Sequence, residues 1–186
     1  MDIIYIIAPI IVGFFGCSVS STRIITQGNQ AVVERWGKYQ RTLDPGLNFI
    51  IPVIDTIAVE ESTRGRISDI KPQPTVTKDN VSVDIDILIH WRVFDLEKVY
   101  YQTEEVDKVE DVEDAVKSLV IETLHSVISH LQLDEIRVSR SKLNQTLLEK
   151  LNQVTDHWGV KVLRLEIQEI KLPESITEFL ENREVA

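Results

Sequence analysis

The sequence predicts an α+β fold in which strands fill the first half of the chain and amphipathic helices fill most of the second. Residues 81–93 (VSVDIDILIHWRV) alternate apolar and polar side chains over thirteen positions, which is typical of a half-buried strand. Between residues 112 and 158, apolar residues recur instead at spacings of three and four, as in amphipathic helices. Because strands and helices occupy separate stretches, an α+β arrangement is favoured over a doubly wound sheet.

Length, composition and charge limit the classes of protein. The chain has 186 residues, of which 43% are hydrophobic, enough for one ordinary domain with a short appendage. The formal net charge is −10, and no basic stripe is present to bind a nucleic-acid backbone. Cys17 is the one cysteine, so neither an intrachain disulfide nor a cysteine-based zinc site can form.

Residues 1–22 are predicted to be a membrane anchor. No charged residue lies between Asp2 and Arg23, a run of 20 positions, and roughly 17–25 residues suffice for a helix to cross the hydrocarbon core. Lys and Arg follow this run but none precedes it, which predicts a single anchor with the body in the cytoplasm. The apolar anchor residues are Ile3, Ile4, Ile6, Ile7, Ile10, Ile11, Val12, Phe14 and Phe15.

Other interpretations of the N-terminus remain open. A cleaved signal peptide usually begins with positive charge, whereas this chain has Asp2. Gly16-Cys17 fits the end of a lipoprotein signal, although the bulky Phe15 fits it poorly. A buried soluble helix would need a polar face that the segment lacks. The alternative is therefore an exported lipoprotein or soluble binding module whose N-terminus is cleaved.

The strands are expected in the following order. Residues 30–36 form a strand, Gly37-Lys38 turns the chain, and residues 39–43 return antiparallel to it. Residues 53–61 form a further strand, and the prolines of residues 71–74 break the pattern because proline cannot donate to a strand ladder.

An apolar stretch follows the turn at Asp44-Pro45-Gly46, where proline fixes φ and glycine accepts a positive φ. From residue 47 to 54, Asn48 is the only polar residue apart from the proline interruption at Pro52. Such a short apolar run fits either a buried strand or a surface that touches lipid.

The helical half begins at Asp95, a plausible N-cap for a short helix through Tyr101. Two longer helices follow over residues 112–131 and 143–158, and Gly159 ends the second. Residues 160–170 return to a strand pattern, with a switch of the apolar face after Val162 that a β-bulge would explain.

The last residues, 173–186, are predicted to start a C-terminal helix. Pro173 suits the first helical turn, and the apolar stripe consists of Ile176, Phe179 and Leu180. The three tryptophans are expected in the core, because their neighbours alternate as buried faces do: Trp36, Trp91 and Trp158.

No catalytic, metal or cofactor-binding residues are identified. His125 and His130 are five residues apart on a helix, so they cannot clamp one metal as an i, i+4 pair would. The zinc-protease HExxH, Gly-rich phosphate loops and the GxSxG nucleophile motif do not occur. The acidic run over residues 104–114 lacks the ligand spacing of a calcium loop and fits a solvated helix start. The sequence therefore predicts a protein that is not an enzyme.

Several blocks resemble the SPFH (band 7) domain of stomatins, prohibitins and flotillins, and the stomatin-like group most. They are residues 27–39 (QGNQAVVERWGKY), the Pro45–Phe49 stretch with Pro52 and Asp55, Thr77–Val81, Leu133–Glu135, Ser139-Arg140 with Asn144, and Trp158–Val162. The resemblance covers about residues 24–184, with the blocks in the family's order.

The resemblance implies an antiparallel β-rich half packed with amphipathic helices, here over residues 24–172, lying on the bilayer behind an N-terminal membrane helix. It implies a scaffold without enzymatic activity that self-associates into homo-oligomers and organises membrane microdomains. The expected partners are membrane lipid, further copies of the chain, and membrane-bound proteases or channels. Family members continue into a long coiled coil, so residues 173–186 are expected to be either a short natural end or a truncated coiled coil.

Two more expectations come from the resemblance. The segment after the Pro-Gly turn lies near the bilayer in this family, so Phe49, Ile50, Ile51 and Pro52 are candidates for an interfacial contact, with Val53 onward pairing as a strand. Family members can also be acylated near the anchor, which makes Cys17 a candidate acylation site. The alternatives are that the first segment is core and that Cys17 is a plain apolar residue.

Overall fold

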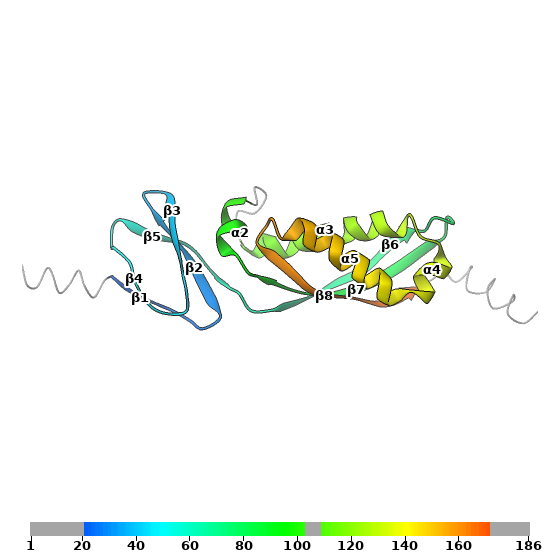
Figure 1. Cartoon of the computed structure of the whole chain (residues 1–186), viewed down its shortest axis with the longest axis horizontal. Helices are drawn as coiled ribbons and strands as arrows, with labels where there is room; N and C mark the ends of the chain where they lie inside the picture. The colour runs from blue at the N-terminus through cyan, green and yellow to red at the C-terminus, as the bar shows by residue number, and fades with distance from the viewer. Residues whose placement is uncertain (1–20, 103–108, 172–186) are drawn as a thin grey trace, which may run out of the picture. The chain divides into compact units, whose positions relative to one another are not determined.

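The computed structural model describes residues 21–102 and 109–171 (Figure 1). These residues divide between two compact units, unit 1 up to Arg64 and unit 2 from Gly65 onward. Each unit is described by itself below. The predicted anchor residues Ile3–Phe15 and the predicted helix over residues 173–186 lie outside the described residues.

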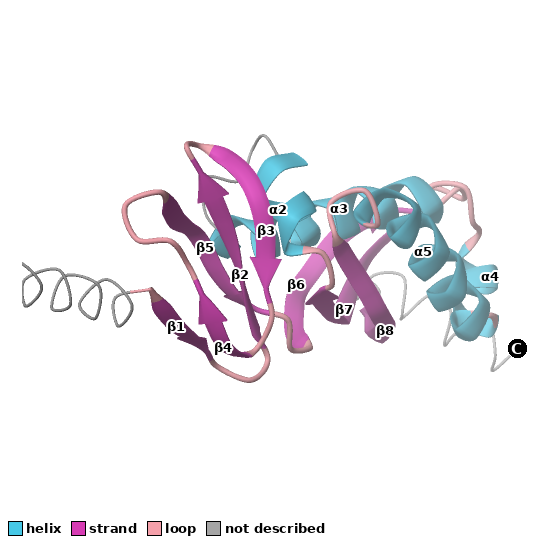
Figure 2. Ribbon diagram, turned by 60° about the vertical axis from the view of Figure 1, so that its left-hand side comes forward, coloured by secondary structure: helices cyan, strands magenta, loops and turns pink. Residues whose placement is uncertain are grey.

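Unit 1 consists of short antiparallel strands. β2 (Asn29–Arg35) lies between β3 (Lys38–Leu43) and β5 (Asp55–Ser62), as Figure 2 shows. β1 (Thr22–Ile25) and β4 (Gly46–Phe49) pair separately as a two-stranded ribbon. The predicted β2–β3 hairpin is confirmed, whereas the ribbon places part of the ambiguous apolar stretch in a strand.

The core of unit 1 is small. It is built from one face of β2, one residue from each of β1 and β3, and the residue after β4: Ala31, Val33, Ile25, Leu43 and Ile50, with the half-buried Ile57 packed against them. Because so few side chains are buried, the polar contacts that fix the loop after β4 matter for the shape of this unit.

The turn between β2 and β3 corrects one prediction. Trp36 and Gly37 have φ values of 56° and 72°, the two positive angles of a type I′ hairpin turn. The Trp36 side chain projects from the turn and is 79% exposed, so the expectation that it is core is wrong. Trp91 is fully buried as predicted, and Trp158 is half-buried.

Unit 2 is built on a second antiparallel sheet. Its central strand is β7 (Ser82–Val93), with β6 (Arg66–Val76) on one edge and β8 (Val160–Lys171) on the other. The predicted alternation along β7 is confirmed, and the buried face consists of Val83, Ile85, Ile87, Ile89, Trp91 and Val93.

Helices cover this buried face of the sheet (Figure 1). They are α2 (Leu96–Gln102), α3 (Val109–Ile128), α4 (Leu133–Val138) and α5 (Arg140–Thr155). The three predicted helices are confirmed within a few residues at their ends. The Asp95 carboxylate accepts a bond from the Lys98 amide at 3.3 Å, which confirms Asp95 as the cap of α2.

The prolines of residues 71–74 do not end a strand, contrary to prediction. β6 runs through them because it is an edge strand, where a missing donor faces away from the ladder. The pairing register shifts between Ile70 and Gln73, so the irregularity at Pro72 is absorbed as a bulge.

A bulge in β8 confirms the predicted switch of its apolar face. Trp91 pairs with Val162 while the adjacent His90 pairs with Arg164, which leaves Leu163 as the extra residue. Leu163 is exposed, and burial resumes at Leu165 on the shifted face.

A polar chain ties the sheet of unit 2 to α3. The Trp91 indole N–H donates to the Ser68 hydroxyl at 2.9 Å, and that hydroxyl donates to Glu113 at 2.9 Å. Glu113 also pairs with Lys117 at 2.8 Å. Ser68 and Trp91 are both buried, so their polar atoms depend on this chain for hydrogen bonds.

Ser68→Ala is expected to destabilise unit 2 by about 1–3 kcal/mol, because it leaves the buried Trp91 donor unsatisfied. Urea unfolding followed by tryptophan emission measures the loss. The double variant Ser68→Ala with Trp91→Phe removes donor and acceptor together, so it should lose less stability than the sum of the single variants. A sum that is simply additive would contradict the assigned bond.

Candidate membrane-facing surface

The stretch after the Pro45-Gly46 turn alternates between the core and solvent. Leu47, Phe49, Ile51 and Val53 are exposed, whereas Ile50 between them is only 8% exposed. The alternation begins in β4 and continues beyond its end. An apolar stretch of this kind therefore supplies both a core residue and an outward apolar row.

β1 extends the outward row. Ile24 pairs directly with Leu47 across the ribbon, and Thr22 pairs with Phe49. Directly paired residues share a face of a sheet, so Ile24, Leu47 and Phe49 lie on the same side. We define the apolar surface as Ile24, Leu47, Phe49, Ile51 and Val53, all of which are exposed.

The loop that carries part of this surface is held by polar contacts. The Ile50 amide donates to the Ser21 carbonyl at 2.7 Å, and the Ile51 amide donates to the Asp55 carboxylate at 2.9 Å. Arg35 binds the same carboxylate through two nitrogens, at 2.8 and 3.3 Å. Asp55 thus fixes the backbone on which Ile51 is displayed.

Val53 lies at the tip of the loop and is fully exposed. Its φ of 74° is in the left-handed region, which is unusual for a β-branched residue and costs of order 1–3 kcal/mol. The expectation that Val53 begins a strand is wrong, because β5 starts at Asp55 and the preceding residues form this turn.

Trp36 lies at the same end of unit 1 as this loop. The last residue of β2, Arg35, pairs with the first residue of β3, Lys38, and with the first residue of β5, Asp55. The turn at Trp36 and the loop before Asp55 therefore emerge from one end of the sheet. An exposed tryptophan beside exposed aliphatic groups is typical of side chains at a membrane–water interface.

The two units differ in formal net charge. Residues 1–64 contain five Lys and Arg against six Asp and Glu, a net charge of −1, whereas residues 65–186 contain 15 against 24, a net charge of −9. Arg23 is exposed next to Ile24, and the Arg41 guanidinium donates to the Phe49 carbonyl. The apolar surface thus lies on the unit that an anionic membrane repels least, and Arg41 contacts the backbone of one of its residues.

The Arg35–Asp55 contact makes unit 1 sensitive to acid. The Arg35 guanidinium, and after it the Ile51 amide, hold the pKa of the Asp55 carboxyl below its ordinary value. A carboxyl whose pKa is lower in the folded state stabilises fully above its unfolded pKa of about 4, and the stabilisation is lost as the pH falls through the folded pKa.

We therefore expect the amides of β2 and β5 to lose hydrogen-exchange protection below about pH 4, after correction for intrinsic exchange rates. Asp55→Asn should lose part of that protection already at pH 6 and show a weaker dependence between pH 6 and pH 3. Equal pH dependence of the wild type and the variant would contradict the role of this carboxyl. Hydrogen exchange reports on individual amides of unit 1. A global unfolding measurement would also respond to Asp79 and Glu113 in unit 2, because their pKa values are lowered as well.

The structure exposes some of the predicted lipid-contact residues and buries one of them. Phe49 and Ile51 are exposed, and Pro52 is half-buried. Ile50 is a correction, because its side chain belongs to the core of unit 1 and cannot touch lipid there. Cys17 lies outside the described residues.

Sequence reasoning missed Ile24, Leu47, Val53 and Trp36 as surface residues. The alternation over residues 47–53 was a readable signal for two of them, since every second side chain shares a direction. Trp36 stands before Gly37 in a two-residue turn, which is also a reason to expect exposure.

In the part of the chain that the structure describes, no three His, Cys, Asp or Glu side chains are grouped as metal ligands would be. Within the same ranges, no helix combines the length and apolar composition that a membrane span requires.

Comparison with known proteins decides the family. The model of the SPFH domain / Band 7 family matches residues 23–186, nearly the whole chain after the predicted anchor. The chain belongs to the SPFH/Band 7 family. An uncharacterized protein of Methanocaldococcus jannaschii is 38% identical over 158 residues, which cover 85% of this chain and 76% of that protein.

Stomatin-like proteins are also similar to this SPFH chain. Human mitochondrial stomatin-like protein 2 is 36% identical over 157 residues, 84% of this chain and 42% of its own length. The Caenorhabditis elegans stomatin-like protein stl-1 is 34% identical over 157 residues, 84% of this chain and 47% of its own. This chain therefore spans less than half the length of the stomatin-like relatives that it matches.

Proposed function

We propose that the chain is a membrane-anchored SPFH scaffold without enzymatic activity, whose unit 1 contacts the bilayer through the apolar surface. The anchor is residues 1–22 and the body lies in the cytoplasm. The observation that carries the proposal is the row of exposed apolar side chains close in sequence to the predicted anchor, beginning at Ile24. The match to the SPFH family and to stomatin-like proteins supports a membrane scaffold in general.

A modest contact energy is enough for such a role. Complete burial of a Val, Leu, Ile or Phe side chain is worth about 1.5–3 kcal/mol. A tether holds the apolar surface at high effective concentration beside the lipid, so partial insertion of a few side chains suffices to keep unit 1 on the membrane. Acylation of Cys17 would add a second membrane signal in the same region.

Self-association completes the proposed scaffold. Homo-oligomers on the membrane would gather lipid and hold membrane-bound proteases or channels in a microdomain. Support for this part comes from the family, and the net charge of −10 argues against nucleic acid as a partner. The competing proposal is an exported lipoprotein or soluble binding module, favoured by the Gly16-Cys17 pair.

The size and intact mass of the full chain, extracted from membranes in mild detergent, test the proposal. We expect a homo-oligomer whose subunit mass includes residues 1–22, with an added acyl mass if Cys17 is modified. A subunit that begins at residue 17 or later would support the exported alternative. A monomer with the anchor intact would remove self-association from the proposed function.

A further inference from the structure

The sheet of unit 2 has two edges, and they are protected in different ways. β6 forms one edge and carries Pro72 and Pro74, which cannot donate to a further strand. β8 forms the other edge (Figure 2), and its twelve residues include no proline. An edge strand without protection presents its N–H and C=O groups to the strands of other chains.

The side-chain amide of Asn152 occupies one residue of the β8 edge. Its nitrogen donates to the Val162 carbonyl at 3.0 Å, and its oxygen accepts a bond from the Val162 amide at 3.1 Å. Two residues on adjacent antiparallel strands exchange the same pair of bonds. Val162 lies opposite Trp91 in the ladder, but both of its backbone groups bind Asn152, so they point away from β7. Asn152 therefore stands where a further strand would pair.

Asn144 extends this contact beyond the bulge at Leu163. Its side-chain oxygen accepts a bond from the Ile167 amide at 3.4 Å. Asn144 and Asn152 are eight residues apart in α5, a spacing that places both on one face of the helix, and both are half-buried. We call these two side chains the edge amides. Asparagine is a poor helix former, so its presence at both positions inside a helix fits a role other than helix stability.

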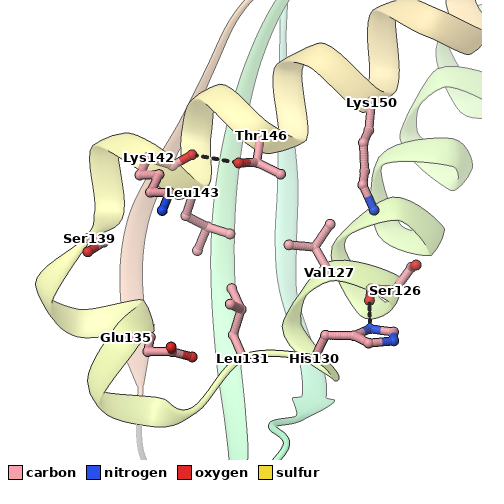
Figure 3. Close-up of a pocket in the computed structure, with 10 residues that line it drawn as sticks. All are labelled: Ser126, Val127, His130, Leu131, Glu135, Ser139, Lys142, Leu143, Thr146 and Lys150. Atoms are coloured by element: carbon pink, nitrogen blue, oxygen red, sulfur yellow. Dashed lines mark hydrogen bonds between the residues drawn. The ribbon is translucent and has the colours of Figure 1, made fainter.

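Other side chains hold α5 in place. Leu143, Leu147 and Leu151 are buried, and the helix lies over the buried face of the sheet. Figure 3 shows Leu143 of α5 and Val127 of α3 pointing into the pocket between these two helices. Because these apolar contacts position the helix, removal of the edge amides should open the edge of β8 and leave α5 where it is.

The sequence of β8 is suited to pair with a second copy of itself. When two β8 strands lie antiparallel with residue 165 at the centre, Arg164 of each copy lies opposite Glu166 of the other. Opposite charges directly across an antiparallel pair are favourable, and two-fold symmetry supplies this pair twice. Within one chain Arg164 and Glu166 contact each other and both keep exposed surface, so they can exchange that contact for two between copies. The strand that fits an open β8 edge is therefore β8 of a second copy.

We propose that the edge amides, Asn144 and Asn152, form an autoinhibitory contact, in which they occupy the outer edge of β8 and prevent β8 of a second copy from adding to the sheet. Folded copies can then meet on a membrane without joining their sheets. The inference goes beyond the proposed function, because it assigns α5 a role in limiting which surfaces associate. It does not depend on the lipid contact of unit 1.

Cross-linking between two differently marked copies tests the contact. In a Cys17→Ser background, one copy carries Arg164→Cys and the other Glu166→Cys, and the full chains are reconstituted together into vesicles. With the edge amides intact, mild oxidation should give little disulfide-linked pair. Asn144→Ala with Asn152→Ala in both copies should raise the yield at least tenfold, because these changes open the edge while alanine favours the helix.

Two controls test whether the effect belongs to the edge and to the proposed pairing. Gln145→Ala with Gln153→Ala removes two exposed amides at the same spacing from the same helix, and the yield should not change. Cysteines at residues 164 and 171 are not opposite each other in the proposed pairing. In the background without the edge amides, they should give at least tenfold less product than cysteines at residues 164 and 166.

Hydrogen exchange provides a second readout at the edge itself. The Val162 amide should exchange at least tenfold faster in Asn152→Ala than in the unsubstituted chain. Val120→Ala removes buried side-chain volume from α3, so it destabilises unit 2 without touching the edge, and it should not raise the cross-linking yield. Asn152→Ala alone gives the same comparison if the double variant does not fold.

The outcomes either support the inference or overturn it. An unchanged yield in a variant whose Val162 amide exchanges faster would overturn it and show that the edge amides only support α5. An equal rise for the Gln145 and Gln153 pair or for Val120→Ala would trace the product to loss of stability and would also overturn it. An unchanged exchange rate would show that Asn152 does not hold the edge. None of these results decides the anchor or the homo-oligomer of the proposed function, which the size and intact mass test separately.

Discussion

Replacing Phe49 and Val53 together by serine is expected to weaken vesicle binding of residues 21–186 by about 100-fold. The two exposed side chains contribute about 3 kcal/mol when they enter the acyl boundary, and 1.4 kcal/mol corresponds to a factor of ten. Removal of residues 1–20 is needed for this measurement, because the predicted anchor would otherwise hold the variant on the vesicle. Co-sedimentation with vesicles that contain anionic lipid measures the binding.

The matched control is Ile67→Ser with Val138→Ser, which removes two exposed aliphatic side chains from unit 2. This control should bind as the unsubstituted fragment does. Ile50→Ser is a second comparison, because it should destabilise unit 1 through its core and not through a lipid contact. Equal losses for the Phe49/Val53 pair and the Ile67/Val138 pair would contradict a defined membrane-facing surface.

Gly159→Ala is expected to cost unit 2 about 3 kcal/mol or more, because it adds a steric clash to an unfavourable backbone conformation. Gly159 has a φ of 74°, and a Cβ there would clash with the Asp95 carbonyl oxygen. The Gly159 carbonyl also accepts bonds from the amides of Phe94 and Asp95, at 3.0 and 3.2 Å. The residue just before β8 is therefore hydrogen-bonded to the backbone that follows β7.

Urea unfolding measured by tryptophan emission gives the loss for Gly159→Ala. Gly37→Ala isolates the backbone contribution, because Gly37 has a φ of 72° and nothing near a new Cβ, and it should cost about 1–2 kcal/mol. Gly65→Ala has open space and no positive φ, so it should be close to neutral. A Gly159→Ala loss no greater than that of Gly37→Ala would show that the close approach to Asp95 is relieved at little cost.

The strands and helices with strong periodicity could be predicted from the sequence. The thirteen-residue alternation that became β7 has one buried face, so its pattern is a direct record of burial. The switch after Val162 predicted the bulge at Leu163, since an extra residue reverses which side chains face the core. The N-cap at Asp95 also follows from local chemistry. The helix predicted to stop at Gly159 ends earlier, at Thr155, and Gly159 lies in the turn before β8.

Other features depend on neighbours that the sequence does not reveal. β6 passes through Pro72 and Pro74 only because it is an edge strand, and edge positions are set by topology. Ile50 and Ile51 are adjacent and equally apolar, yet one is core and the other is exposed, because the Asp55 contacts fix the loop direction. The alternation around Trp36 predicted a core position, yet Trp36 stands in a two-residue turn that leaves its side chain exposed.

Contact between residue 53 and lipid is the most direct test of the proposed membrane-facing surface. Cys17 is the only cysteine, so Cys17→Ser with Val53→Cys gives the full chain one attachment site for an environment-sensitive fluorophore. Brominated lipids should quench that fluorophore and leave a label at Val138→Cys, an exposed valine position in unit 2, unquenched. A label at residue 53 that stays accessible to aqueous iodide and insensitive to brominated lipid would contradict the account.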